Sequence, residues 1–249
     1  MSLPNPPLPN PPLPNPSLPN TLEDAIVQAQ AATTAAIADG YRRIQVDLLF
    51  PELKIMPVAE QFLPVFEHLG SQFRVYFPDA GAAALAKRDW GDKPYAIRGI
   101  NDLKAEMQPD EQAFLFVQPS SVEVLDVETL CQQAMDRPVV MLNPKLEDIA
   151  TIGIGYAGRQ LRERFLSTFE SCYYLRPLEG AAVFRAYPGL WQVWQDREGS
   201  YELIAEETQR PTGEVLDRIL LGTGNAAEAQ PARRGLLSSL QQFLRALSQ

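Results

Sequence analysis

Short, almost wholly apolar segments alternate with amphipathic segments through the first part of this 249-residue chain, and this alternation constrains its fold more than any other feature. The apolar segments predict strands at residues 43–50, 73–77, 95–100, 113–117 and 138–142. The segments between them predict helices at 57–69, with Pro64 as a break, and at 80–88 and 120–136. Apolar strands separated by helices are typical of a parallel sheet covered on both faces. The sequence therefore predicts an α/β fold whose first half is a mainly parallel, Rossmann-like sheet.

A helix is also expected ahead of the first strand, where Thr21 and Asp24 resemble a capping box and Gly40 ends the helical pattern. The pattern changes after a predicted helix at 157–169. Four strand-like segments then follow with short turns between them, at 172–178, 181–188, 190–196 and 201–207. Such spacing predicts an antiparallel meander, which a short helix at 212–220 closes. We expect a single α/β domain over residues 21–221.

The two ends of the chain differ from this domain in composition. Residues 1–20 carry a pentad repeat, L-P-N-P-P, whose prolines favour a polyproline-II tether. Residues 222–235 read as a flexible linker, and residues 236–249 predict an amphipathic helix. Its apolar positions are Leu236, Leu237, Leu240, Phe243, Leu244 and Leu247. Because a linker precedes this helix, it is free to dock on a partner or a membrane surface.

Charge and composition argue against several classes of function. The net charge of −9 repels phosphate backbones, so nucleic-acid binding is not expected. The two cysteines, Cys131 and Cys172, stand in apolar segments and are interpreted as buried free thiols. Together with the single histidine, His68, they do not make a typical zinc site, so no metal or cofactor is expected. No apolar run reaches the length of a membrane span and no secretory signal is recognised, which indicates a cytoplasmic protein.

The predicted parallel strands end in a recurring way, with a proline next to a polar side chain. In an open α/β sheet, ligands bind beyond the carboxyl ends of the strands. The polar side chains that would share this edge are Glu52, Asp79, Ser120, Ser121 and Asn143. One interpretation is a ligand pocket with two carboxylates. The other, which we favour, is that these residues end strands and cap the helices that follow.

Gly153, Gly155 and Gly158 form a literal G-x-G-x-x-G in "TIGIGYAGRQL". A dinucleotide-binding turn needs a strand directly before the first glycine and a helix after the last. The helix is expected, but the only candidate strand is the short "DIATI", and an antiparallel meander is expected after the helix instead of another strand–helix–strand unit. The pattern therefore disfavours dinucleotide binding.

Arginines and tryptophans follow this segment. Arg159 and Arg162 share a helical face, and we expect Arg176 and Arg185 on strands. These arginines can contact a partner or an anion, or else pair with the chain's own acids. Trp191 and Trp194 are expected on opposite faces of a strand, with at least one of them accessible. An accessible Trp191 would be a partner contact.

Four segments together resemble a known family: "LPNTLEDAIVQAQAAT", "FPDAGAAALAKRDWG", "LRERFLSTFESCYYLRPLEG" and "VFRAYPGLWQVW". They resemble a domain of unknown function found in cyanobacteria and plastids, whose members include a plant low-photosystem-II-accumulation factor that assembles the core antenna protein CP43. A similar domain is attached to a plastid adenylate kinase. The resemblance covers about residues 18–222 and carries no active-site residues with it.

The resemblance implies a cyanobacterial protein that acts near thylakoids. Together with the lack of a complete catalytic constellation in the sequence and the two tether-like ends, it leads us to expect a non-enzymatic accessory or assembly factor of the photosynthetic apparatus that acts by protein–protein interaction. Its partner would be a photosystem subunit or an assembly intermediate, and the factor would lie in the cytoplasm or at the surface of the thylakoid membrane. The alternative is a small-molecule or nucleotide-binding enzyme with its pocket at the carboxyl edge of the parallel strands.

Overall fold

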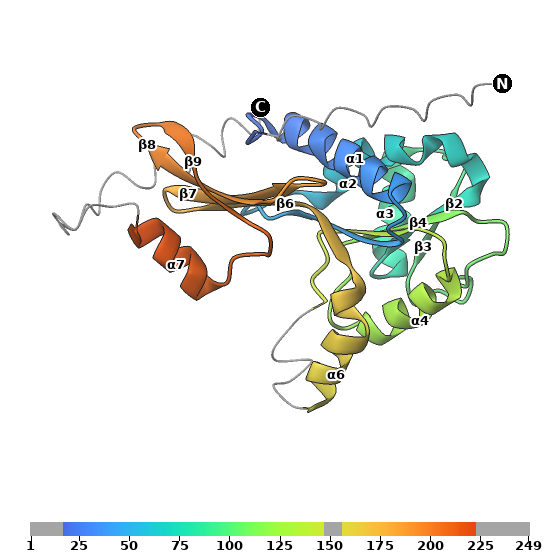
Figure 1. Ribbon diagram of the computed structural model, residues 1–249. Helices are drawn as coiled ribbons and strands as arrows, with labels where there is room; N and C mark the ends of the chain where they lie inside the picture. Colours follow the sequence, from blue (N-terminus) through green and yellow to red (C-terminus); the bar gives the residue numbers. More distant parts are fainter. Residues whose placement is uncertain (1–16, 147–155, 223–249) are drawn as a thin grey trace, which may run out of the picture.

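The computed structural model describes residues 17–146 and 156–222, and these residues form one nine-stranded sheet with helices on both faces (Figure 1). The strand order is β3-β2-β4-β5-β1-β6-β7-β8-β9. The strands are β1 Arg43–Leu48, β2 Phe73–Phe77, β3 Ala96–Gly99, β4 Ala113–Val117, β5 Val139–Leu142, β6 Glu170–Leu178, β7 Ala181–Ala186, β8 Trp191–Arg197 and β9 Ser200–Glu207. All pairs from β3 to β6 are parallel, and all pairs from β6 to β9 are antiparallel. The predicted fold class is therefore confirmed.

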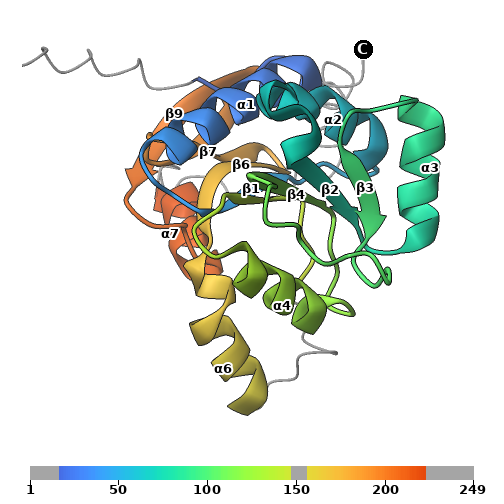
Figure 2. The same cartoon turned by 90° about the vertical axis from the view of Figure 1, so that its right-hand side faces the viewer.

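Helices divide between the two faces of the sheet. Helices α1 (Leu22–Ala38), α2 (Ile55–Phe62) and α3 (Ala80–Trp90) pack into one apolar core with β1, β2 and β6. Helices α4 (Val124–Ala134) and α6 (Tyr156–Arg164) pack on the opposite face, against β2, β4 and β5. Helix α7 (Gly213–Gly222) lies on that second face as well, below the meander. Figure 2 shows α1 and α2 above the sheet and α4 and α6 below it.

Local signals place several helix boundaries where they were predicted. The Thr21 hydroxyl accepts a hydrogen bond from the backbone N–H of Asp24 at 3.0 Å, so Thr21 caps α1. Gly40, with a φ of +96°, follows the end of the same helix. The chain breaks from α2 into two 3-10 helices, Leu63–Val65 and Glu67–Gln72, at the predicted Pro64.

Two boundaries differ from the prediction because side chains form turns. Helix α4 begins at Val124 and not at 120, since the Glu123 carboxylate accepts hydrogen bonds from the backbone and hydroxyl of Ser120. Helix α6 ends at Arg164, and a 3-10 helix, Leu166–Thr168, follows it.

The segment at 172–178, expected as the first strand of the meander, also belongs to the parallel part of the sheet. It lies in β6, which pairs parallel with β1 along one edge and antiparallel with β7 along the other. Strand β1 is thereby enclosed between β5 and β6, in the middle of the sheet. This enclosure gives the side chains of β1 close neighbours on both sides.

Candidate functional site

The parallel pairing brings the predicted pocket residues to one edge of the sheet, because they follow four adjacent strands, β2, β4, β5 and β1. Their polar groups serve turns there. Asp79 caps α3 by accepting a hydrogen bond from the backbone N–H of Ala82 at 2.8 Å. Asn143 has a φ of +48°, and its side-chain amide accepts from the N–H of Leu48 at 2.6 Å and donates to the C=O of Leu48 at 2.8 Å. Asn143 thus holds the ends of β5 and β1 together.

The remaining members of the set have similar surroundings. The Ser120 hydroxyl donates to the buried carboxylate of Glu123 at 2.7 Å. Ser121 is buried, and Glu52 is exposed in a turn with a φ of +59°. None of the five predicted residues lines either of the two cavities described below.

Of the glycine motif, Gly153 and Gly155 lie outside the described residues, and Gly158 is buried in α6. As expected, an antiparallel meander follows α6 instead of another strand–helix–strand unit, although its first strand, β6, also pairs parallel with β1. The candidate strand "DIATI", directly ahead of Gly153, lies outside the described residues as well, so the expectation about this part of the fingerprint stays a prediction.

Both cysteines are free and buried in the structure. Burial raises the pKa of the Cys131 thiol and of the Cys172 thiol to about 12 each. A thiol with such a pKa stays protonated at neutral pH and is a poor nucleophile. In the part of the chain that the structure describes, no group of three or more His, Cys, Asp or Glu side chains is placed to hold a metal ion.

The predicted partner contacts separate into exposed and enclosed residues. Arg159, Arg162 and Arg176 are exposed. Arg185 instead donates to the Glu170 carboxylate at 2.7 Å and lies over the ring of Trp191 at 5.4 Å. Trp191 itself is only 4 % exposed, so it is a core residue and not a surface contact.

Trp191 is buried because it packs beneath Tyr174, with ring centroids 5.1 Å apart. The more accessible of the two tryptophans is Trp194, on the opposite face of β8, where it packs at the margin of the core that α1 covers. The prediction that the two tryptophans lie on opposite faces of a strand was correct, but the alternation in the sequence could not say which of the two faces other elements cover.

A polar cavity that the sequence prediction missed lies on the second face of the sheet, beside the carboxyl half of β1. It has a volume of about 290 Å³, and we call it the Asp47 cavity. Its polar lining comes from β1, β6 and the segments after β5 and β9, namely Gln45, Asp47, Lys145, Tyr174 and Arg210. Its apolar lining includes Leu49, Leu146, Leu166 and Phe169. Gln45 and Asp47 share one face because they are two positions apart on a strand.

The electrostatics of this cavity centre on Asp47, which is 3 % exposed. Its carboxylate accepts a hydrogen bond from Gln45 Nε2 at 2.8 Å. Burial raises the pKa of Asp47 to about 6, while the Gln45 hydrogen bond and the charge of Arg210 oppose the rise. Arg210 donates to the Tyr174 hydroxyl at 2.7 Å, and its guanidinium lies 4.4 Å from the centroid of that ring. Asp47 is therefore mostly ionised at pH 7.5 and has an oppositely charged group near it.

One feature of the sequence pointed to this site. Gln45 and Asp47 interrupt the predicted strand at 43–50 at every second position, while β5 beside it and β4 beyond β5 are wholly apolar. A polar pair on one face of a central strand indicates either a hydrogen-bonded network or a cavity.

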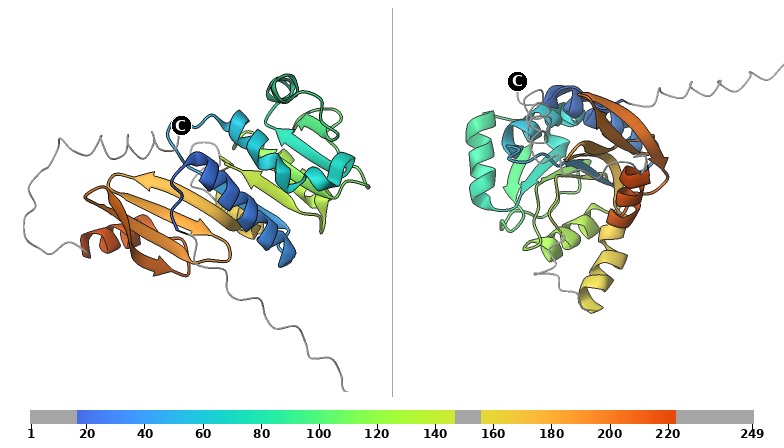
Figure 3. Two further views of the ribbon diagram at one scale, coloured as in Figure 1. Left: turned by 90° about the horizontal axis from the view of Figure 1, so that it is seen from above. Right: turned by 90° about the vertical axis from the view of Figure 1, so that its left-hand side faces the viewer.

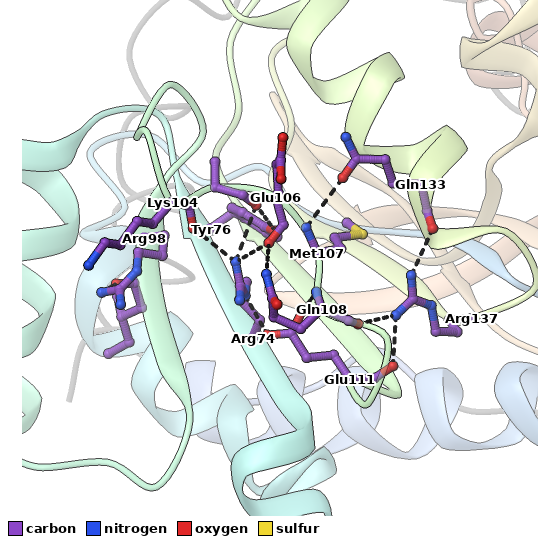
Figure 4. A network of polar contacts seen from close by, with 12 residues as sticks. Arg74, Tyr76, Arg98, Lys104, Glu106, Met107, Gln108, Glu111, Gln133 and Arg137 are labelled. Atoms are coloured by element: carbon purple, nitrogen blue, oxygen red, sulfur yellow. Dashed lines mark hydrogen bonds and ion pairs between the residues drawn. The ribbon is translucent and has the colours of Figure 1, made fainter.

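A second polar cluster joins the loop between β3 and β4 to the sheet (Figure 4). Arg74 Nε donates to Glu111 Oε1 at 2.5 Å, and Arg74 Nη1 donates to three backbone carbonyls, those of Lys104, Ala105 and Glu106. Glu111 Oε2 accepts from the backbone N–H of Gln108 at 2.7 Å. We call this the Arg74–Glu111 network. Its donors and acceptors are used to fix the course of a loop.

A larger, mainly apolar cavity of about 640 Å³ lies beside this network, at the amino ends of β4 and β5. Val65, Phe66, Leu69 and Pro138 contribute to its lining, and the single histidine of the chain, His68, lies at it too. His68 has no cysteine or serine beside it in this lining.

Comparison with known proteins places the chain in a family. A family model described as "Domain of unknown function (DUF1995)" matches residues 19–218. The chain belongs to this family. The match begins just before α1 and ends within α7, so the DUF1995 domain takes in the whole nine-stranded sheet. No solved structure matches the chain. In the described part of this DUF1995 chain, none of the helices has the length and apolarity needed to cross a membrane.

Proposed function

We propose that this DUF1995 chain is a non-enzymatic accessory factor that acts by binding a protein partner in the assembly of the photosynthetic apparatus. The proposal places it among the cyanobacterial and plastid relatives that include the photosystem II assembly factor. Its partner would be a photosystem II subunit or an assembly intermediate. The factor would act from the cytoplasm, at the surface of the thylakoid membrane.

The observation that carries the proposal is the accessible edge of β9. This strand ends the sheet, and no other described strand pairs with its outer edge. At eight residues it is twice as long as β3, the strand at the opposite edge, which has four. A long unpaired strand edge presents backbone groups that can pair with an extended segment of another chain.

The face of the meander next to the β9 edge also supports the binding of a partner segment. In the left view of Figure 3, the strands of the meander extend beyond the blue helix α1, which crosses the middle of the sheet. Leu203 of β9 pairs across the strands with Trp194 of β8, and Leu203 is 42 % exposed. An accessible apolar side chain next to an aromatic one is a suitable anchor for a partner segment.

The charges of β9 indicate what kind of segment fits. Glu202, Glu206 and Glu207 lie on this strand, Asp196 lies near the end of β8, and Glu198 lies in the turn between the two strands. One cation, Arg197, pairs with Glu202 at 3.2 Å, so acidic groups outnumber basic ones along this edge. We therefore expect the partner segment to be extended and basic, and its binding to weaken as salt is added. The predicted helix 236–249, which lies outside the described residues, would supply a second contact with the partner or the membrane.

The test is to tag the chain in its native host and to identify what co-purifies from gently solubilised membranes. We expect photosystem II subunits or assembly intermediates with the wild-type chain. Leu203→Lys places a cation on the acidic edge strand and should reduce their yield by roughly tenfold, the effect of about 1.4 kcal/mol. Leu103→Lys is the matched control, because Leu103 is fully exposed and lies in the loop after β3.

The possible outcomes test the identity of the partner and the use of the β9 edge independently. Recovery of the tagged chain alone, in both the membrane and the soluble fraction, would contradict the proposed function. Recovery of photosystem subunits at an unchanged yield with Leu203→Lys would keep the function and exclude the β9 edge as its contact.

A further inference from the structure

We propose that the Asp47 cavity binds a free α-amino acid with an apolar side chain, whose ammonium group pairs with Asp47 and whose carboxylate pairs with Arg210 and Lys145. This inference goes beyond the proposed function, because it assigns a small-molecule site on the face of the sheet opposite α1.

The Asp47 carboxylate has acceptor capacity that the described residues leave unused. An ionised carboxylate has about four lone-pair sites. Among the described residues, the hydrogen bond given to Asp47 is the one from Gln45 Nε2. A buried carboxylate with a single donor is costly, and nothing in the fold of β1 requires it. A ligand ammonium, with three N–H donors, would supply the missing hydrogen bonds.

Opposite charges are separated across the cavity. Asp47 is buried, whereas Lys145 and Arg210 also line the cavity but are exposed. The anionic group thus lies deep in the cavity and the cationic groups lie nearer to solvent. Arg210 is held in place by Tyr174, both through the hydroxyl and through the ring. A zwitterion whose positive end enters first matches this arrangement.

The volume of the cavity suits a ligand of this size. Pockets for drug-sized ligands span about 300–1,000 Å³, so a cavity of about 290 Å³ stands at the small end of the range. It has room for a single amino acid and is small for a dinucleotide. The apolar lining from Leu146, Leu166 and Phe169 gives an apolar side chain a surface to contact. The site therefore favours residues such as leucine or phenylalanine over polar amino acids.

The experiment is a thermal-shift screen of the full chain against the free L-amino acids, each at several millimolar, followed by calorimetry with the best of them. At about 100 times Kd, we expect Tm to rise by roughly 5 °C or more. Two analogues of the best amino acid identify the groups that matter. The α-hydroxy acid lacks the ammonium group and the amino alcohol lacks the carboxylate, and each should bind at least about tenfold more weakly.

Variants tie the binding to the cavity. Asp47→Asn keeps the shape and the hydrogen bond from Gln45 but removes the charge, and it should weaken the best amino acid by at least about tenfold. Arg210→Gln should weaken it less, because Lys145 remains. Asp126→Asn, at an exposed position on α4, is the matched control and should leave Kd unchanged. The ligand-induced shift is compared within each variant, since Asp47→Asn also changes the stability of the free protein.

The proposal is overturned if no amino acid raises Tm, or if the α-hydroxy acid binds as tightly as the amino acid. It is also overturned if Asp47→Asn binds the amino acid as tightly as the wild-type chain does. Any of these results would leave the proposed partner-binding function of the β9 edge untouched, since the two sites share no residue.

Discussion

Glu111 and Asp47 are both carboxylates buried in the same domain, 4 % and 3 % exposed respectively, but their surroundings differ. Glu111 has a donor on each oxygen, the Arg74 guanidinium on one and a backbone N–H on the other. Asp47 has a hydrogen bond from Gln45, and Arg210, whose charge lowers the pKa of Asp47, donates to a tyrosine instead. Hydrogen bonds offset the loss of hydration for a buried carboxylate that receives them on both oxygens, whereas a buried carboxylate without them carries that cost. Burial alone therefore does not identify a functional acid, whereas the number of hydrogen-bond donors to its carboxylate does.

The largest expected effect is the loss of stability when the buried ion pair between Arg74 and Glu111 is broken. Arg74→Met removes the cation and leaves Glu111 charged and buried, and it deprives three backbone carbonyls of their donor. We expect the free energy of unfolding to fall by about 3–5 kcal/mol, measured by urea denaturation. Arg88→Met is the control, because the ion pair between Arg88 and Asp89 is exposed, and it should leave the denaturation midpoint unchanged. A loss below about 1 kcal/mol for Arg74→Met would show that the Arg74–Glu111 network does not stabilise the fold.

The next largest effect is a pH dependence of the free energy of unfolding that comes from Asp47. The pKa of Asp47 is about 6 in the folded protein and 3.8 is its ordinary value, so the folded state holds the proton more tightly. The stability that this provides is fully present below about pH 4 and is lost as the pH rises through 6. Asp47→Asn cannot titrate, so it should be more stable than the wild type by an amount that grows with pH to about 3 kcal/mol at pH 8. Urea denaturation at pH 4, 6 and 8 measures this difference.

A stability difference between Asp47→Asn and the wild type that stays constant across this pH range would mean that Asp47 has an ordinary pKa and is not the unsatisfied group. Asp126→Asn, exposed on α4, serves as the control in the same buffers.

The smallest expected effect is a change in the pKa of Asp47 when one of its neighbours in the cavity is replaced. Gln45→Leu removes the hydrogen bond that lowers the pKa of Asp47, so that pKa should rise further above its ordinary value. The pH at which Asp47 titrates can be followed by carboxyl ¹³C NMR. Arg210→Gln should raise the same pKa by less, because the charge of Arg210 acts more weakly on Asp47 than the hydrogen bond does. The opposite order would mean that Arg210 and not Gln45 is the main partner of Asp47.

Much of the fold could be predicted from local patterns. The apolar strands β2 and β4 have the predicted bounds, and Thr21 caps α1 as its position suggested. These features depend on side-chain periodicity and on hydrogen bonds between residues a few positions apart, which the sequence carries directly. The polar residues after the parallel strands were also predicted to share one edge of the sheet, because parallel strands end on the same side.

Other features were decided by which strands become neighbours. The parallel pairing of β6 with β1 was not predicted, because its sequence resembles that of the antiparallel strands that follow it. That pairing sets Tyr174 beside Asp47 in register, and it helps to form the cavity that Gln45 and Asp47 line. The face that α7 covers likewise decided that Trp191 is buried while Trp194 is more accessible.

The sequence by itself thus determined the order and type of the elements, their caps and their apolar faces, since these follow from interactions within a few residues. Only the tertiary structure decided that Asp47 would be buried with few partners and Glu111 with many. The reason is physical: the groups that surround a buried charge come from segments far away in the chain, such as Tyr174 and Arg210 around Asp47 and Arg74, which donates to Glu111.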